Sequence, residues 1–577
     1  MAARLYYHRW GIMFALLNAL LIAFWVQEGF EFAAVNYFRD QSVQLPIIYS
    51  YKDSSLFQGD MVLQARDSYV TWFYPALGLI SRYLPLYFVM LGLYVASTGL
   101  TLVAVYFLAE TLFDKHAGMV AVLLWAAWLP NPGGDFLHSS FPTHTTTAIG
   151  LQLLGLALAL RKRYMLGALL LGLAANINAM TSVFIGIVLG FGFLGSRQEW
   201  SWKLIRLPIV MVLAASPTLW WKFGLSPDAD SLSIERFVDI MRLRLWYAVF
   251  PFSVESHLWL LFFLVMGLWL YSARFASTEV NHQMFWMSQG IFSLLVIGTV
   301  FTELYPIEMV IQLQLLRSTW VLNLFAMLYF SNMIALWLRG SRQQVILALG
   351  LTFILALPRV VLELFPLSQP TPYELYQDFD AVRDGSTVTP FGAFGLTVLI
   401  ASVLGVMWRI MPEQQLRNTR RFMGWFVFAA LMFVVPLFVD TAVPSRHAVL
   451  TRDWQETQHW IRSNTPKDAY FVTPPTLDGF RVYAQRASFS DWKDGTLLIF
   501  NRDLAAEWLE RMEALGFDRK RFNFTPLTQS QLCSIAARYH PDYAVVFLSW
   551  RIEGTAIFQN DSFAVLETDT IPCDKNG

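Results

Sequence analysis

Apolar stretches separated by polar connections fill the first 440 residues of the chain. A helix needs about 20 apolar residues to cross the hydrocarbon core of a bilayer, and this length predicts about thirteen transmembrane helices. We expect them near residues 10–27, 86–109, 118–131, 144–160, 164–178, 181–196, 205–222, 257–273, 284–301, 319–338, 344–364, 389–408 and 422–439. The pattern therefore predicts an α-helical polytopic membrane protein.

The hydropathy falls after Asp440, and residues 445–577 have the composition of a soluble domain. Short apolar runs predict strands at 469–473, 543–548 and 562–567, and helical patterns lie at 453–462, 502–515 and 529–539. Helices that alternate with short strands predict a small α/β domain. We therefore expect a transmembrane domain over 1–440 and a separate domain over 445–577.

The composition supports a membrane protein. Hydrophobic residues make up 56% of the 577 positions and charged residues 15%, whereas soluble chains average about 45–50% and about 25%. These values exclude an ordinary cytosolic protein, a disordered chain and a disulfide-rich scaffold. We therefore expect membrane lipids around the protein. Because 42 basic residues balance 42 acidic ones, we expect no nucleic-acid partner.

Basic residues predict the orientation, because cytoplasmic loops carry the excess of Lys and Arg. The predicted cytoplasmic pieces are 1–9, 110–117, 161–163, 197–204, 274–283, 339–343 and 409–421. An odd number of spans then places the C-terminal domain outside. Cys533 and Cys573 both lie in that domain, and an oxidising compartment favours a disulfide between them, with two buried thiols as the alternative.

The first outer loop, residues 28–73, far exceeds the usual helix connection of about 2–8 residues. Its aromatic content predicts a segment packed on the membrane surface, with an interfacial helix near 69–83. A carboxylate at an apolar boundary has a raised pKa unless it is paired, which suits a general base. Alternatively, the acids only solvate the loop; they are Glu28, Glu31, Asp40, Asp53, Asp60 and Asp67.

Two further outer segments hold candidate side chains. Asp135, His138 and His144 lie in one short loop whose spacing matches no zinc signature, so they either bind substrate or cap the loop. Arg317 precedes the tenth span, where a guanidinium is costly without a phosphate or another partner. Arg242 and Arg244, in the loop 223–256, either assist Arg317 or extend to lipid phosphates.

These features resemble the C-type (GT-C) superfamily of membrane glycosyltransferases. The long acidic first loop and a soluble domain after the last span carry the resemblance. So do several motifs, at Asp40–Gln41, 46–48, 52–60, 161–163, 172–178, 314–318, 460–469, 479–481, Arg486 and 491–493. Oligosaccharyltransferase catalytic subunits open their outer domain similarly, but their Trp-Trp-Asp-Tyr-Gly motif is absent, which disfavours protein N-glycosylation.

The resemblance implies inverting transfer of a sugar from a polyprenyl-phosphate donor to a glycan, lipid or other envelope acceptor, outside a bacterial inner membrane. It implies Asp40 as the base, followed by Asp53 and Asp60, and Arg317 at the donor phosphate with Arg244 or Lys493. The expected substrate-binding residues are Glu31, Asp135, His138, His144, Arg481, Asp491 and Trp492. The acids clustered in the loop would accept a divalent metal, although no ligand triad stands out among them. The alternatives are a transporter or flippase of lipid-linked saccharide and an inactive scaffold.

Overall fold

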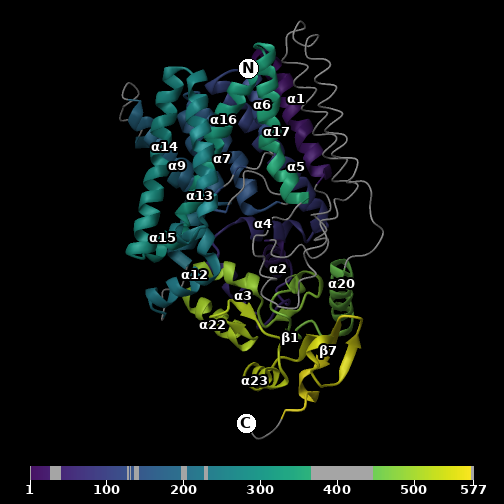
Figure 1. Cartoon of the computed structure of the whole chain (residues 1–577). Coiled ribbons are helices and arrows are strands. Elements are labelled where there is room, and N and C mark those ends of the chain that lie inside the picture. The colour runs from purple at the N-terminus through teal and green to yellow at the C-terminus, as the bar shows by residue number, and fades with distance from the viewer. Residues whose placement is uncertain are drawn as a thin grey trace.

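A computed structural model describes residues 2–25, 40–125, 129, 131–134, 142–196, 205–225, 232–364, 446–477 and 479–573. A bundle of helices forms one part, and the C-terminal domain lies against one end of it (Figure 1). The N-terminus of α1 lies at the opposite end of the bundle. The helices from α1 to α17 outside the first loop are α1 (Ala2–Trp25), α5 (Leu86–Leu112), α6 (Lys115–Leu124), α7 (His144–Leu160), α8 (Tyr164–Ala175), α9 (Ala179–Gly195), α10 (Arg206–Ala214), α11 (Ser216–Trp220), α12 (Ile234–Val249), α13 (Ser256–Ser272), α14 (Thr278–Thr299), α15 (Glu308–Leu313), α16 (Thr319–Trp337) and α17 (Arg342–Leu364).

Helices occupy eleven of the thirteen expected spans, and the spans expected at 389–408 and 422–439 lie outside the described residues. Fewer of these helices qualify as membrane spans when each helix must be both long enough and apolar enough to cross a membrane. Within the described part of the chain, four helices meet both, at Leu86–Leu112, Ser256–Phe275, Thr278–Leu304 and Glu308–Trp337, and one bent pair would make a fifth. A polytopic helical architecture is therefore present, and the count of thirteen is not confirmed.

The span expected at 205–222 is the bent pair, with 66° between α10 and the helix that follows it. Pro217 lies in the first turn of α11, where its missing N–H costs least. The Asn176 side chain bridges the break: its Nδ2 donates to Ala214 O (2.8 Å), and its Oδ1 accepts from Thr218 Oγ1 (3.0 Å). A window of apolar residues does not reveal such a break, because Asn176, whose side chain bridges it, lies about 40 positions away in sequence.

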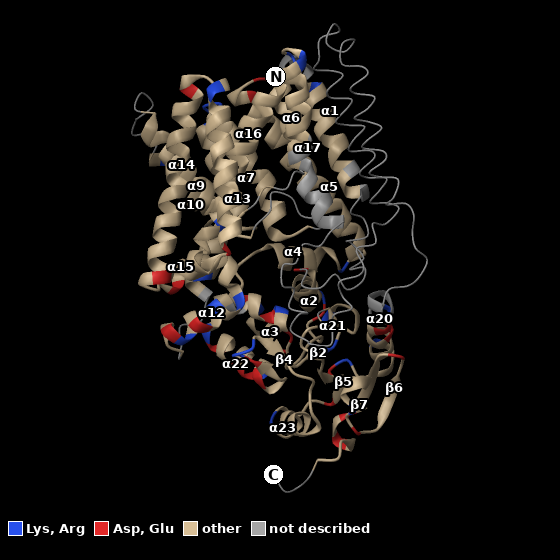
Figure 2. Ribbon diagram, in the orientation of Figure 1, with Lys and Arg blue, Asp and Glu red and all other residues tan. Residues whose placement is uncertain are grey.

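Charged side chains gather at the two ends of the bundle, and the described residues of its middle are almost without them (Figure 2). This distribution fits a hydrocarbon layer around the middle, where a charge is costly. Helix α16 runs through the core, with every residue from Thr319 to Ala335 buried. Helices α7 and α8 approach closely, since a Cβ on Gly167 would lie 2.7 Å from Gly155 O, as small residues allow between membrane helices.

The described part of the first outer loop folds into short helices between the bundle and the C-terminal domain (Figure 1). They are α2 (Gln41–Lys52), α3 (Met61–Gln64), the 3-10 turn η2 (Ala65–Ser68) and α4 (Phe73–Ile80). Helix α2 is buried along most of its length and packs against α4 and against the C-terminal domain. The C-terminal domain thus covers part of α2, a contact that the expected packing on the membrane surface does not include. The helix expected at 69–83 is shortened to the eight residues of α4.

The C-terminal domain is an α/β fold, as its alternating pattern predicts. Its helices are α20 (Arg446–Asn464), α21 (Phe480–Tyr483), α22 (Arg502–Ala514) and α23 (Gln529–Tyr539), and its strands are β1 (Tyr470–Val472), β2 (Ala487–Ser488), β3 (Phe517–Asp518), β4 (Asn523–Phe524), β5 (Tyr543–Phe547), β6 (Ala556–Gln559) and β7 (Phe563–Glu567). Five strands form a mixed sheet in the order β2-β1-β5-β7-β6. Parallel pairs join β1 to β2 and β5, and antiparallel pairs join β7 to β5 and β6. Cys533 and Cys573 form a disulfide, with Cα atoms 5.6 Å apart.

Candidate functional site between the first loop and the C-terminal domain

Asp40 and Lys493 meet where the first loop touches the C-terminal domain. Asp40 immediately precedes α2, but its side chain caps no backbone N–H of that helix. Lys493 Nζ instead donates to Asp40 Oδ1 at 2.8 Å, across 453 positions of sequence. The Asp40 side chain is 56% exposed, whereas the Lys493 side chain is 7% exposed. The carboxylate is therefore accessible, and its partner is held inside the protein.

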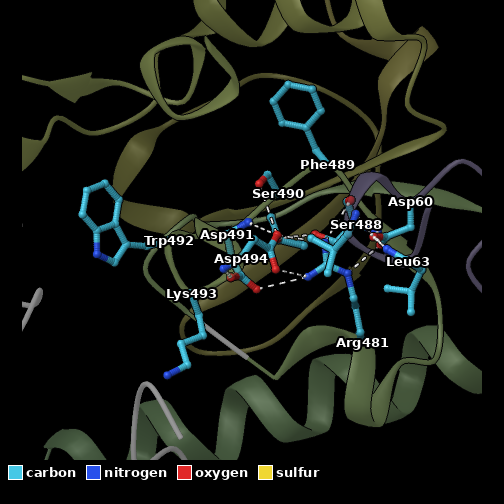
Figure 3. A network of polar contacts seen from close by, with 12 residues as sticks. Asp60, Leu63, Arg481, Ser488, Phe489, Ser490, Asp491, Trp492, Lys493 and Asp494 are labelled. Atoms are coloured by element: carbon cyan, nitrogen blue, oxygen red, sulfur yellow. Dashed lines mark hydrogen bonds and ion pairs between the residues drawn. The ribbon is translucent and has the colours of Figure 1, made fainter. Parts of the chain in front are cut away.

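Lys493 lies in a short 3-10 turn, η12 (Trp492–Thr496). Asp491 and Asp494 close this turn with a reciprocal capping box, in which each side chain accepts from the other's backbone N–H. Both carboxylates face the interior of the domain, and Lys493 points away from them (Figure 3). The capping box fixes the backbone of this turn. Lys493, which lies between Asp491 and Asp494 in sequence, therefore extends toward Asp40.

Arg481 binds these acids together in a buried ion-pair network (Figure 3). Its guanidinium donates to Asp494 through two nitrogens (2.9 and 3.0 Å), to Asp491 Oδ2 (3.3 Å) and to Asp60 Oδ2 (2.5 Å). The four side chains are almost fully buried. A fork of N–H groups suits several carboxylates at once, so Arg481 fixes η12 to the first loop.

Asp60 has all of its acceptor capacity engaged by the protein. Its Oδ1 caps α3 by accepting from Val62 N (3.1 Å) and Leu63 N (3.3 Å), and its Oδ2 also accepts from Ser488 N (2.9 Å). The residue is fully buried. A carboxylate in this position cannot reach an external hydroxyl, so the structure favours a structural role over the expected role as a base.

Asp53 lies at the other end of α2, about 20 Å from Asp40 along a helix of this length. Its carboxylate pairs with Lys467 (3.0 Å) and accepts from Ser55. The Ser55 hydroxyl, with Lys467, lowers the pKa of Asp53 to about 2. Both partners in the ion pair are partly exposed. Asp53 therefore belongs to a second, surface contact with the C-terminal domain and does not share a site with Asp40.

Arg317 and His144 act on Asp40 from the bundle. Although the Asp40 side chain is more than half exposed, the protein around it removes part of its solvent, which alone would raise its pKa. The Lys493 ammonium, with the field of Arg317 and His144, instead lowers this pKa below the ordinary value. The raised pKa expected for an unpaired carboxylate is thus absent because Asp40 is paired. Three of the residues singled out in the sequence therefore surround Asp40 within electrostatic reach.

A tight turn presents Arg317. Gln314 ends α15 in the left-handed conformation (φ 47°), and the 3-10 turn η9 (Leu315–Ser318) follows. Gly133 packs on this turn so closely that a Cβ there would lie 2.6 Å from Arg317 Cα. Asn131 Oδ1 accepts from the Thr319 hydroxyl beside it. The Asn131–Gly134 segment therefore supports the turn that carries the guanidinium.

His144 begins α7 and contacts two tyrosine hydroxyls. The Tyr69 hydroxyl lies 2.7 Å from His144 Nε2, and the Tyr74 hydroxyl lies 3.3 Å from Nδ1. Asn178 caps α9 and donates to Thr145 Oγ1 (2.8 Å), the neighbour of His144. These contacts fix the imidazole within electrostatic reach of Asp40.

Arg244 meets the C-terminal domain from α12. Its Nε donates to Trp492 O (2.9 Å), and its guanidinium carbon lies 5.7 Å from the centre of the Trp492 ring. Burial lowers the pKa of Arg244, and Asp491 and Asp40 act in the opposite direction. Arg244 thus secures the backbone next to Lys493 and adds positive charge near Asp40.

Glu31, Asp135 and His138 lie outside the described residues. Within the described ranges, no group of three or more His, Cys, Asp or Glu side chains could hold a metal ion. The described part of the first loop therefore offers no set of ligands for the divalent metal that the sequence analysis considers.

Some residues of the site carried no recognisable signal. Tyr69 and Tyr74 belong to an aromatic stretch that predicts only an interfacial helix, and Asp494 looks like one more surface acid. Their roles depend on His144 and Arg481, which are remote in sequence. The spacing of Asp491 and Asp494 around a turn was the one signal available, since a capping box needs acceptors three positions apart.

Comparison with known proteins gives distant likenesses. A family model described as a domain of unknown function, DUF6798, matches residues 452–515, which include Arg481 and η12. No curated protein matches the sequence. Among solved structures, the chain is similar to ArnT from Cupriavidus metallidurans in the apo state, with 12% identity, a TM-score of 0.48 and 98% of each chain covered. It is also similar to the archaeal oligosaccharyltransferase AglB from Archaeoglobus fulgidus in complex with an inhibitory peptide and a dolichol-phosphate, with 12% identity, a TM-score of 0.41, and 94% of this chain and 70% of that one covered. The functional proposal therefore rests on the geometry of the site.

Proposed function

We propose that the protein is a membrane glycosyltransferase of the GT-C type. It moves a sugar from a polyprenyl-phosphate carrier to an acceptor hydroxyl of a glycan or lipid, with inversion. The observation that carries the proposal is the ion pair between accessible Asp40 and buried Lys493, with Arg317 acting on the same carboxylate. A base beside two cations, at the end of a bundle of apolar helices, suits a donor whose phosphate is attached to a lipid.

The proposed reaction uses each of these charges. Asp40 takes the proton of the acceptor hydroxyl while the acceptor oxygen bonds to the anomeric carbon. The bond from that carbon to the phosphate oxygen breaks, and its electron pair stays on the phosphate. Lys493 and Arg317 stabilise the negative charge that develops there. We assign the Tyr69–His144–Tyr74 cluster to the acceptor, because its hydroxyl and imidazole groups can hydrogen-bond to acceptor hydroxyls.

Only one of the three candidate acids fits the base. Asp40 is accessible, whereas Asp60 is enclosed by the Arg481 network and Asp53 lies at the far end of α2. Arg481 and Asp491 support the turn that carries Lys493, and Trp492 anchors it to Arg244. We therefore assign these residues to positioning rather than to contact with the reacting atoms.

We further propose that the site faces the outside of a bacterial inner membrane. The basic residues of the short loops predict a cytoplasmic N-terminus, and α1 begins at the end of the bundle opposite the C-terminal domain (Figure 1). The disulfide in that domain supports an oxidising compartment.

The test is transfer in proteoliposomes with labelled polyprenyl-phosphate sugars and envelope glycans as acceptors. We expect the wild-type protein to release carrier phosphate and to label the acceptor. Arg317→Gln should raise the KM for the donor by about 10- to 100-fold, because a charged hydrogen bond to the phosphate contributes about 1.5–3 kcal/mol.

Arg236→Gln is the matched control, since Arg236 is exposed on the same helix as Arg244, and its KM should stay within about twofold of wild type. Movement of labelled saccharide across the bilayer without transfer would instead support a flippase. Neither transfer nor movement with any donor in the series would support an inactive scaffold.

A further inference from the structure

One ammonium group serves two partners in the proposed reaction. Lys493 Nζ lies 2.8 Å from Asp40 Oδ1, yet the proposed function also gives Lys493 to the donor phosphate. While the pair persists, the carboxylate is held as a stabilised anion and is a weak base. Loss of solvent contact would raise the pKa of Asp40, and Lys493, together with Arg317 and His144, lowers that pKa below its ordinary value.

Among the described residues, five elements bring a charged or titratable group within electrostatic reach of Asp40. Lys493 comes from η12, Arg317 from η9, Arg244 from α12, His144 from α7 and Tyr74 from α4. Among these groups, Lys493, Arg317 and Arg244 are cations. An arriving anion would therefore be attracted to these cations.

We propose that the donor phosphate takes Lys493 from Asp40, so that the carboxylate becomes an active base only after the donor has bound. This inference rests on the proposed function and adds the order of events: donor first, acceptor second. The exchange breaks the Lys493–Asp40 ion pair and forms a Lys493–phosphate ion pair, with no net transfer of protons or electrons. Proton transfer follows only when the acceptor hydroxyl arrives.

The way in which the protein holds Lys493 and Asp40 suits this exchange. The backbone around Lys493 is fixed by the capping box and by the bond from Arg244 Nε to Trp492 O, while the lysine side chain itself has a flexible four-carbon stem. Asp40 is more than half exposed and bears no capping bond. Separating the pair therefore requires a rotation of one side chain, and the released carboxylate is already in contact with solvent.

The experiment measures binding of dodecyl phosphate to the full-length protein in detergent, with dodecanol as the uncharged control. Asp40→Asn should bind dodecyl phosphate about 5- to 10-fold more tightly than wild type, because the phosphate no longer competes for Lys493. Lys493→Met should bind it about tenfold more weakly. In the Lys493→Met background, adding Asp40→Asn should change the affinity by less than about twofold.

The double variant separates an exchange from simple charge repulsion. If Asp40→Asn tightens binding equally with and without Lys493, or does not tighten it at all, the exchange is overturned while the proposed function stands. If wild-type protein binds dodecyl phosphate no better than dodecanol, the proposed function falls with it. Asp53→Asn removes an acid at the other end of α2 and should leave the affinity unchanged.

Discussion

Asp40→Asn is expected to lower the transfer rate by about 10²- to 10⁴-fold, the range typical for loss of a general base. The amide has the shape of the carboxylate but cannot accept the acceptor proton. Asp40 is partly exposed and caps no helix, so the variant should fold normally. The measurement is the single-turnover rate with labelled donor, beside the melting temperature of each protein.

Asp53→Asn is the control for this experiment, because Asp53 ends the same helix and forms a comparable ion pair with the C-terminal domain. Its rate should stay within about twofold of wild type, as expected for an exposed pair. A rate for Asp40→Asn close to that of Asp53→Asn would show that the base lies elsewhere.

Arg481→Met should produce the largest loss of stability in the C-terminal domain. It leaves Asp60, Asp491 and Asp494 buried without the guanidinium they share. Breaking a buried pair in this way costs about 3–5 kcal/mol, which corresponds to a fall of about 10 °C or more in melting temperature for a domain of this size. Thermal unfolding and limited proteolysis of the full chain measure the effect.

Arg462→Met is the matched control, since Arg462 has an exposed side chain on α20. It should change the melting temperature by no more than about 1–2 °C. If Arg481→Met had the same melting temperature as Arg462→Met, the ion-pair network would contribute little to stability. The proposal that this network fixes the backbone around Lys493 would then be contradicted.

The elements most accessible from sequence were those defined by local periodicity. Helix α7 begins and ends where the apolar run at 144–160 predicts, and β5 and β7 match their expected strands within one residue. Strands β2, β3 and β4 have two residues each, too few to produce an alternating pattern. Their positions depend on neighbouring strands, which a single window of sequence does not contain.

The candidate site was partly accessible for a different reason. Asp40 and Arg317 stand out because a charge at an apolar boundary is costly without a partner, and Lys493 belongs to a motif that carries the resemblance. The structure brings Arg317 and Lys493 within electrostatic reach of Asp40. The distinction between Asp40 and Asp60 was not accessible. It depends on Arg481, which lies 421 positions from Asp60 in sequence and 2.5 Å from it in space.

The most direct test is a cryo-electron microscopy map of the protein saturated with a polyprenyl phosphate. The account predicts phosphate density about 3 Å from Lys493 Nζ and from the Arg317 guanidinium, with the Asp40 carboxylate turned away from Lys493 and open to the acceptor side. Phosphate density at another place on the protein, with the Asp40–Lys493 pair intact, would contradict it.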